Sequence, residues 1–228
     1  GYKVGSIVLM MVLAFNLNWQ PFYLKNKDKP PILKFENIGN LFISVLLMTT
    51  WIISFLGPFV LSFNWSENGW FSIIGKEFWP GLIIVPAVCL AYVFYGIFIV
   101  QMPPLYLKNK QNWIPFFWGI GALTNILLNY FLIQKLGFIG ASMATLLTYI
   151  VMVNLIIYKN KTWMPIKINY IYFIPCSILV FITAQYNLYS WFVSFSLELN
   201  LTFILLNFIC CLLNVANISH MYKKYNEQ

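Results

Sequence analysis

The chain has very few charged side chains. Charged residues make up only 9% of its 228 residues, with no arginine, one histidine and six acidic residues. A soluble chain of this length needs far more charge to cover its surface. Hydrophobic residues instead make up 61% of the sequence, and the mean hydropathy is +0.75. These values exclude an ordinary soluble fold and are typical of an integral membrane protein.

Residue types that carry catalysis or bind metals are equally scarce. The four cysteines all fall inside apolar runs without metal-ligand spacing, so we expect small hydrophobes rather than disulfides or metal ligands. The single histidine, His220, lies in the C-terminal tail. The sequence contains no pattern of a catalytic triad, a phosphate-binding glycine loop or a metal cluster. We therefore expect no enzyme activity, no cofactor and no metal.

What the sequence does have is a series of long apolar runs. A bilayer core of about 30 Å is crossed by about 20 residues of apolar helix, and the sequence supplies that length seven times. The predicted fold is an all-α, polytopic transmembrane bundle that occupies the whole chain, 1–228. Glu198 lies near the start of the last run, so an alternative begins that helix near Leu199 and leaves Glu198 at the water interface. The predicted spans are 3–24, 40–63, 80–103, 113–134, 138–158, 168–186 and 191–217.

The lysines alternate between connections, and this predicts the orientation. Eleven of the 14 lysines follow the first, third, fifth and seventh spans, whereas Lys3, Lys76 and Lys135 fall at the other ends. By the positive-inside rule the lysine-rich connections are cytoplasmic and the N-terminus faces out. In a soluble protein the net charge of +8 would suggest nucleic acid. Here the bilayer sets the spacing of the basic residues, so we expect membrane lipids as partners and no nucleic acid.

Prolines lie within or close to the ends of several predicted spans. Pro58, Pro86, Pro115 and Pro175 each remove a backbone hydrogen bond that neighbouring groups must replace. Such positions permit bending, as in transporters that open a cavity. Prolines are also tolerated more often in membrane helices than in soluble ones. Both interpretations stay open.

Asparagines are the main polar groups inside the spans. Asn125 and Asn129 are four residues apart and share one face of the fourth span, so they face protein or water rather than lipid. Helix packing is the favoured interpretation, and contact with a substrate is the alternative. The same weighing applies to Asn16, Asn18, Asn154, Asn200, Asn207 and Asn214.

The last predicted span also carries a polar stripe. Asn200, Asn207 and Asn214 repeat every seven residues, which indicates a surface that packs against a partner.

Two charged residues lie near the ends of spans. If upstream sequence extends the first helix, the Lys3 ammonium can face a cavity and pair with an anionic headgroup or phosphate. The alternative is a lysine that reaches the outer interface. Glu198 is either a proton or cation site or a carboxylate solvated at the interface. The candidate substrate-binding residues are Lys3, Asn16, Asn125 and Asn129.

Two segments carry a resemblance to a known family. One is YKVGS at 2–6 followed by AFNLNWQPF at 14–22, and the other runs from NILLN at 125–129 through LGFIGA at 136–141 to Ala144 and Thr145. The chain resembles the C-terminal half of polysaccharide flippases of the multidrug/oligosaccharidyl-lipid/polysaccharide exporter superfamily, the Wzx-type O-antigen and capsule transporters. The first segment is similar to that family's helix with Tyr-Lys near its start and Trp-x-Pro-Phe near its cytoplasmic end. The second is similar to the family's Asn-rich helix, two-glycine outer turn and small-residue helix.

The resemblance implies half of a two-bundle transporter, with the N-terminal half of the same transporter as its partner. The implied activity moves an undecaprenyl-pyrophosphate-linked oligosaccharide across the bacterial cytoplasmic (inner) membrane for surface polysaccharide biosynthesis. Such a headgroup cannot cross hydrocarbon unaided, and a hydrophilic cavity that opens to each side in turn removes that barrier. Apart from Lys3, this half offers no intramembrane cation. We therefore expect the main charged groups of the cavity in the other half.

Three other functions remain open. A membrane-embedded polysaccharide polymerase or polyprenyl-linked glycosyltransferase would need acids, arginines or histidines in sizeable outer loops. A drug exporter of the same superfamily would have a smaller cavity and acidic residues in the full protein. The prolines and intramembrane asparagines only weakly disfavour a scaffold without transport activity.

Overall fold

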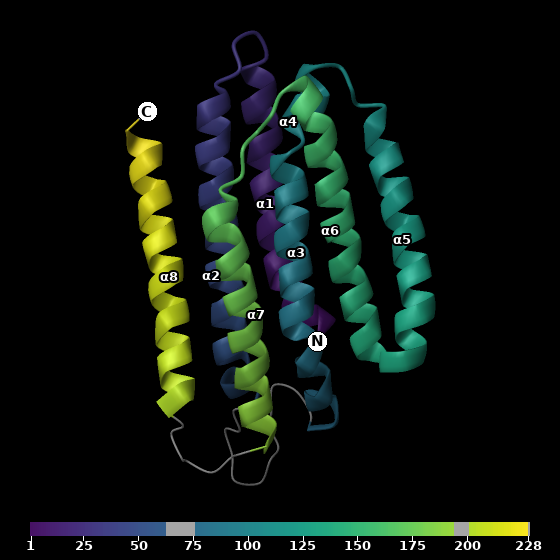
Figure 1. Ribbon diagram of the computed structural model, residues 1–228, viewed down its shortest axis with the longest axis vertical. Helices are drawn as coiled ribbons and strands as arrows, with labels where there is room; N and C mark the ends of the chain where they lie inside the picture. The colour runs from purple at the N-terminus through teal and green to yellow at the C-terminus, as the bar shows by residue number, and fades with distance from the viewer. Residues whose placement is uncertain (63–75, 194–200, 228) are drawn as a thin grey trace.

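The computed structural model describes residues 1–62, 76–193 and 201–227, which form a bundle of long helices (Figure 1). Seven of these helices are long and apolar enough to cross a membrane, and the described residues contain no strand. The predicted all-α, polytopic bundle is therefore confirmed. The elements are α1 (Tyr2–Lys25), α2 (Ile32–Ser62), the 3-10 helix η1 (Lys76–Ile84), α3 (Val85–Val100), α4 (Pro103–Leu107), α5 (Trp113–Leu136), α6 (Phe138–Trp163), α7 (Tyr170–Val193) and α8 (Leu201–Asn226).

Several helices extend beyond the predicted spans. α2 begins at Ile32 rather than at 40, so Lys34 and Glu36 belong to its first turns. α8 continues to Asn226, and the expected C-terminal tail is therefore helical. The predictions stopped short because they followed the apolar runs, whereas a helix can continue into water with charged residues. Glu198 and Asn200 lie outside the described residues.

The third predicted span, 80–103, consists of three pieces: η1, α3 and α4. Pro86 lies in the first turn of α3, and Pro103 in that of α4. A missing N–H is tolerated there because the first N–H groups of a helix have no partner in the helix. Pro115 likewise lies in the first turn of α5, whereas Pro175 is inside α7. Pro86, Pro103 and Pro115 therefore mark helix starts, whereas Pro58, like Pro175, lies inside a helix.

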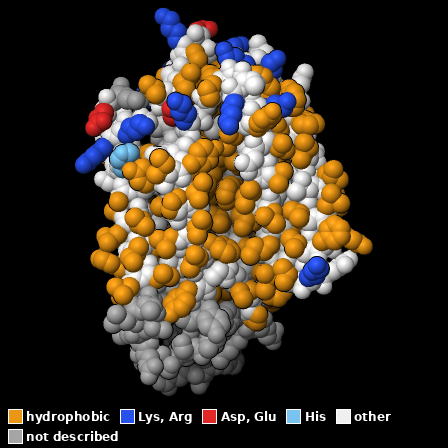
Figure 2. Space-filling model, viewed as in Figure 1, with side chains coloured by type: hydrophobic (Ala, Val, Ile, Leu, Met, Phe, Trp, Pro, Cys, Tyr) orange, Lys and Arg blue, Asp and Glu red, His pale blue; other side chains and the backbone are white. Residues whose placement is uncertain are grey.

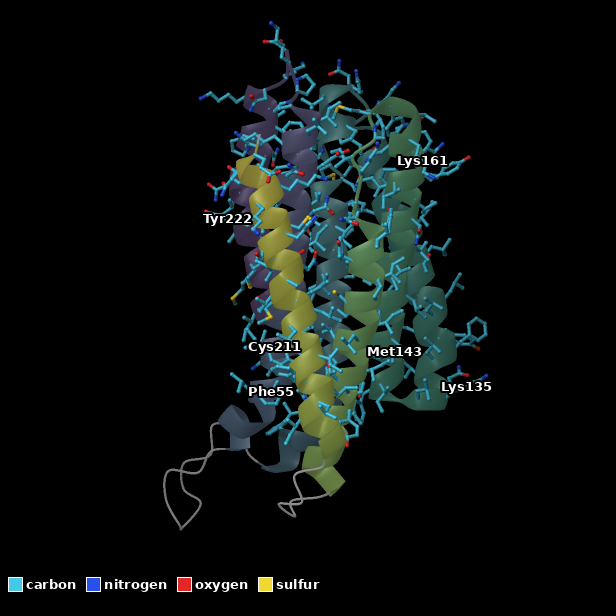
Figure 3. The ribbon with its side chains drawn as sticks, turned by 60° about the vertical axis from the view of Figure 1, so that its left-hand side comes forward. Phe55, Lys135, Met143, Lys161, Cys211 and Tyr222 are labelled. Carbon is cyan, nitrogen blue, oxygen red and sulfur yellow. The ribbon has the colours of Figure 1, made fainter. Side chains whose placement is uncertain are left out.

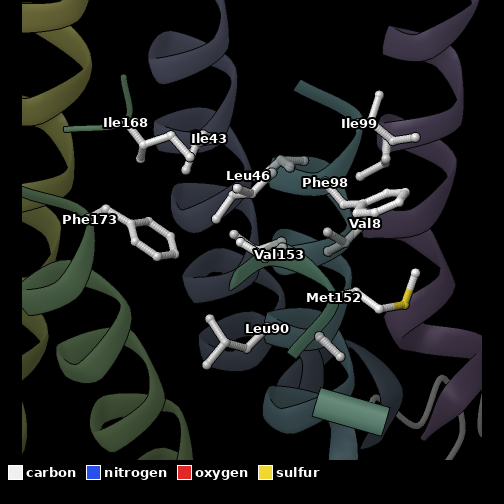
Figure 4. Packing of buried hydrophobic residues seen from close by; sticks show 14 of the residues in the cluster. Val8, Ile43, Leu46, Leu90, Phe98, Ile99, Met152, Val153, Ile168 and Phe173 are labelled. Carbon is white, nitrogen blue, oxygen red and sulfur yellow. The ribbon is translucent and has the colours of Figure 1, made fainter. Parts of the chain in front are cut away.

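Helix α3 is the centre of the bundle. Of the most apolar 18 consecutive residues of the span Pro80–Leu107, to which α3 belongs, 78% are buried, against 11% for α5 at the edge of the molecule. α3 packs against α1, α2, α6 and α7, and the buried side chains around it form the core (Figure 4). Gly96 lets α2 approach closely, because a Cβ at that position would lie 2.6 Å from Leu46 Cδ1. Gly5 does the same for α1, where a Cβ would lie 2.5 Å from Val88 Cγ1.

The connections divide between two ends of the bundle. The α1–α2, α4–α5 and α6–α7 connections and the C-terminus lie at one end, and the N-terminus and the α5–α6 turn lie at the other (Figure 1). Lysines gather at the first of these, which we call the basic end (Figure 2). Lys161 and Lys135 mark opposite ends of the α5–α6 hairpin (Figure 3). The bundle thus has the lysine asymmetry that the alternation predicts, while the side of the membrane that the basic end faces stays a prediction.

Candidate functional site

The predicted site residues belong to two helices that do not form one site within the described part of the chain. Lys3 is exposed, and its ammonium makes no ion pair or hydrogen bond with the described residues. Asn16 is partly buried on the flank of α1 that also carries Tyr2. It lies about four helical turns nearer the basic end than Tyr2. Asn125 and Asn129 belong to α5. Their role as substrate-binding residues stays a prediction.

Asn125 and Asn129 make the hydrogen bonds expected of helix packing. Asn125 Nδ2 donates to Thr148 Oγ1 of α6 at 3.3 Å, and Asn129 Nδ2 donates to Asn125 Oδ1 at 2.9 Å. Thr148 Oγ1 in turn donates to the Ala144 carbonyl. Asn125 therefore joins α5 to α6, while Asn129 donates to Asn125 within α5. The bond between the helices agrees with helix packing, the interpretation that the sequence favours.

Asn207 and Asn214, the two members of the asparagine stripe that the structure describes, lie on α8 and face the inside of the bundle. Asn207 and Asn187 of α7 exchange two hydrogen bonds, of 2.9 and 3.1 Å, and Trp51 Nε1 of α2 also donates to Asn207 Oδ1. Asn214 is 1% exposed and donates to the Cys210 carbonyl of its own helix. The partner surface that the stripe predicted is thus formed by α2 and α7 of the same chain.

A second polar group lies on α3 and α6, and its members are Tyr92, Tyr95 and Tyr149, which we call the tyrosine cluster. The rings of Tyr95 and Tyr149 have centroids 5.3 Å apart and are tilted by 37°. Trp118 of α5 packs edge-on against Tyr95 at 6.1 Å. Tyr92 is close enough for an electrostatic interaction to Tyr149 and also to Tyr2 of α1. Four helices thus contribute aromatic rings to one surface.

The hydroxyls of the tyrosine cluster have no partner among the described residues. Tyr92, Tyr95 and Tyr149 are each only partly buried, and none makes a hydrogen bond with the described part of the chain. Tyr92 and Tyr95 lie near the middle of the span Pro80–Leu107, and Tyr149 lies near the middle of Phe138–Trp163. At that depth a hydroxyl exposed to lipid would lose its hydrogen bonds to water at a considerable cost. The cluster therefore indicates a surface that meets water, a polar ligand or other protein.

The tyrosine cluster lies on the side of α3 that is turned away from α7. Phe94 packs edge-on against Phe173 of α7, at 5.5 Å, whereas Tyr95 packs against α5 and α6. On α5, Asn125 follows Trp118 by seven residues, so both lie on one stripe of that helix. Asn125 and Asn129 are therefore placed along the same edge of α5 that borders the cluster.

A buried amide pair lies at the break between α3 and α4. Asn160 Nδ2 of α6 donates to both the backbone carbonyl and Oε1 of Gln101, each at 2.9 Å, and Gln101 Nε2 donates to the Ile166 carbonyl at 2.9 Å. Both side chains are at most 1% exposed. Pro103 and Pro104 have no N–H to continue the helix from α3, and Leu105 N–H, the usual helical donor to the Gln101 carbonyl, donates to the Met102 carbonyl instead. Asn160 Nδ2 takes its place at the Gln101 carbonyl.

The extended segment 164–169 between α6 and α7 is tied to α2. Lys167 N–H donates to Glu36 Oε1 at 2.8 Å, and Asn169 N–H donates to Asn40 Oδ1 at 2.8 Å. Asn40 Nδ2 donates back to the Lys167 carbonyl at 3.0 Å. These contacts join α2 and the α6–α7 segment at the basic end.

Sequence reasoning missed both of these arrangements and also the tyrosine cluster. Gln101, two residues before the first of two prolines, was an available signal, because a polar residue at a helix break often replaces lost hydrogen bonds. Asn160 stands between two lysines, just beyond the end of the predicted span 138–158. The tyrosines carried no such signal, since a tyrosine within an apolar run is an ordinary core residue.

A small cavity lies between α1, α2, η1, α3 and α7. Its volume is about 10 Å³, room for one water molecule at most. Such a space cannot hold a sugar. The lining residues are Val4, Ile53, Ser54, Gly57, Leu82, Val85 and Leu188.

The fold and these polar groups define a multi-pass α-helical membrane protein with a partly exposed aromatic and polar surface at mid-membrane depth. Comparison of the chain with family models, with curated proteins and with solved structures gives no match.

Proposed function

We propose that the chain is the C-terminal bundle of a transporter that flips an undecaprenyl-pyrophosphate-linked oligosaccharide across the bacterial cytoplasmic membrane. The observation that carries the proposal is the tyrosine cluster, whose hydroxyls have no partner among the described residues at mid-membrane depth. A bundle that only anchored a protein would have no use for such a surface. The resemblance of 2–22 and 125–145 to polysaccharide flippases names the substrate class.

In this proposal the surface around the tyrosine cluster is one wall of a cavity, and the N-terminal bundle of the same transporter is the other. Opening the cavity first to the cytoplasm and then to the outside lets the headgroup cross while the lipid tail stays in the bilayer. Asn125 and Asn129 lie on the stripe of α5 that borders this wall, and Asn16 lies on the flank of α1 that carries Tyr2. Lys3 lies at the end opposite the basic end, where its ammonium can pair with the pyrophosphate at the outer leaflet.

A polymerase or glycosyltransferase lacks comparable support, whereas a drug exporter must be separated by experiment. A polymerase or glycosyltransferase would need acidic or basic side chains gathered at a polar site, and the described residues contain no cluster of three or more His, Cys, Asp or Glu side chains that could hold a metal. A drug exporter of the same superfamily fits the bundle equally well, so the experiment must separate it from a flippase.

The test is deletion of the gene in its bacterial host, with mass spectrometry of lipid-linked oligosaccharides and a lectin that probes them in spheroplasts. We expect the undecaprenyl-pyrophosphate oligosaccharide to accumulate and to stay hidden from the lectin until the membrane is permeabilised. The reason is that without the transporter the sugar stays on the cytoplasmic leaflet.

Each alternative gives a different result. Accumulated oligosaccharide that the lectin reaches in intact spheroplasts indicates a lost polymerase and contradicts the proposal. Normal oligosaccharide levels with hypersensitivity to cationic dyes indicate a drug exporter. Re-expression of the full-length protein must reverse the phenotype, which controls for effects on neighbouring genes.

A further inference from the structure

We propose that the tyrosine cluster is a binding site for the sugar part of the substrate rather than for its pyrophosphate. The inference rests on the proposed function and assigns one part of the headgroup to Tyr92, Tyr95 and Tyr149. It starts from the three hydroxyls that have no partner among the described residues. A phenol hydroxyl both donates and accepts hydrogen bonds, as do the hydroxyls of a sugar.

The rings supply the second half of the recognition. Tyr95 and Tyr149 are tilted by only 37° at 5.3 Å, and Trp118 stands edge-on to Tyr95 at 6.1 Å. Trp118 is 42% exposed, so part of its ring is free to be covered. A pyranose presents C–H groups on its faces and hydroxyls at its rim. An aromatic surface with hydroxyls therefore matches both kinds of sugar surface.

The charge of the surface decides between the two parts of the headgroup. The residues of the cluster and its neighbours Trp118, Asn125 and Asn129 are all uncharged. A pyrophosphate taken from water into this surface would have no cation to compensate its charge, and the cost would be large. A neutral sugar needs only hydrogen bonds. The surface is thus suited to the sugar, and the pyrophosphate is left for the cations of Lys3 or of the other bundle.

The test is lipid binding by the full-length protein in nanodiscs, measured by calorimetry with two probes. One probe is the undecaprenyl-pyrophosphate oligosaccharide extracted from the host, and the other is undecaprenyl pyrophosphate without sugar. The variant combines Y92F, Y95F and Y149F, which keep the rings and remove the hydroxyls. We expect at least a tenfold loss of affinity for the oligosaccharide lipid and no change for undecaprenyl pyrophosphate, because about one hydrogen bond is lost per hydroxyl.

A matched control is Y130F, since Tyr130 is 64% exposed on α5 away from the cluster. This variant should bind both probes like the natural protein. Y95F alone should give a smaller loss of the same kind if the triple variant does not fold.

Three outcomes overturn the inference. Equal losses of affinity for both probes would mean that the hydroxyls do not recognise the sugar. Unchanged affinity for both would mean that the hydroxyls contact no part of the ligand. Unchanged binding with a lower thermal stability would mean that the hydroxyls bond to the other bundle. Failure of the natural protein to bind either probe is distinct from these, because it removes the proposed function as well as the site.

Discussion

The Gln101–Asn160 pair has a structural role that a single substitution can test. Asn160 donates to two oxygens of Gln101, and Gln101 fixes the Ile166 carbonyl. All of these groups are buried. A buried polar atom without a hydrogen-bond partner lowers the free energy of unfolding by more than a typical hydrogen bond raises it. Asn160 Oδ1 itself has no partner within the described residues. The arrangement therefore depends on the two side-chain N–H donors, Asn160 Nδ2 and Gln101 Nε2.

We expect N160L to destabilise the protein by about 1–3 kcal/mol, because it leaves two oxygens of Gln101 buried without a donor. In a chain of this length that corresponds to a Tm lower by roughly 2–10 °C. The measurement is thermal unfolding of the purified full-length protein in detergent.

The matched control for this prediction is N154L on the same helix. Asn154 is exposed and its amide donates only to the Ile150 carbonyl of its own helix. N154L should leave Tm within about 1 °C of the natural value, because surface substitutions usually change stability little. Equal effects of the two variants would contradict the role assigned to Asn160.

Among the helical elements, the α5–α6 hairpin is the most independent. α5 packs chiefly on α6, and the two are joined by Gly137 alone, with φ +56°, a value that favours glycine. Gly121 lets the helices approach, since a Cβ there would lie 2.5 Å from Met152 Sδ. A small residue at the contact thus brings the two backbones together, as is common in membrane helix pairs.

G121L should separate α5 from α6 and destabilise the protein by about 1–3 kcal/mol through overpacking. Met152 is the residue displaced, so the added substitution M152A should restore part of the lost stability. The check is again Tm in detergent, measured for the single and the double variant.

Gly119 provides the control, because no atom lies within 4 Å of a Cβ placed there. G119L should therefore have little effect. If G119L lowers Tm as much as G121L does, the loss reflects helix propensity or lipid contact rather than helix packing.

The sequence predicts those features that depend on local patterns, and it misses those that depend on contacts between residues far apart in the chain. The spans follow from hydrophobic length, which is a local property, and so seven spans were predicted in the right order. The boundary between the last two was wrong, because residues 191–193, predicted in the seventh span, belong to α7. The break after Gln101 was not, although Pro103 and Pro104 stand beside it, because the break depends on an amide donated by Asn160, 59 residues away. The Asn125–Asn129 face was predicted because a four-residue spacing is itself local. The tyrosine cluster depends on the packing of α3, α5 and α6, which no local pattern reports.

For the whole molecule, the distribution of lysines makes a testable statement about orientation. The basic end carries the α1–α2, α4–α5 and α6–α7 connections, and Lys135 lies at the other end (Figures 2 and 3). Lysines are retained on the cytoplasmic side during insertion. The basic end should therefore be cytoplasmic.

Cysteine labelling in spheroplasts checks this orientation. The four natural cysteines are first replaced, and K27C, K110C or K135C is then introduced singly into the full-length protein. We expect a membrane-impermeant maleimide to label K135C in intact spheroplasts, and to label K27C and K110C only after permeabilisation. All three positions are exposed, so burial does not limit labelling. The reverse pattern would invert the topology, and the proposed place of Lys3 at the outer leaflet would be wrong.

The hydrogen bonds that hold the segment 164–169 determine which positions tolerate substitution. Glu36 and Asn40 bind the main chain of Lys167 and Asn169, and Gln101 binds that of residue 166. Main-chain groups are the same for every residue except proline. Positions 167 and 169 should therefore accept many residue types in related proteins. The side chains at 36, 40 and 101 and the length of the segment should be conserved. A mutational library covering 36, 40, 101, 167 and 169 should show tolerance to substitution at 167 and 169 and intolerance at 36, 40 and 101.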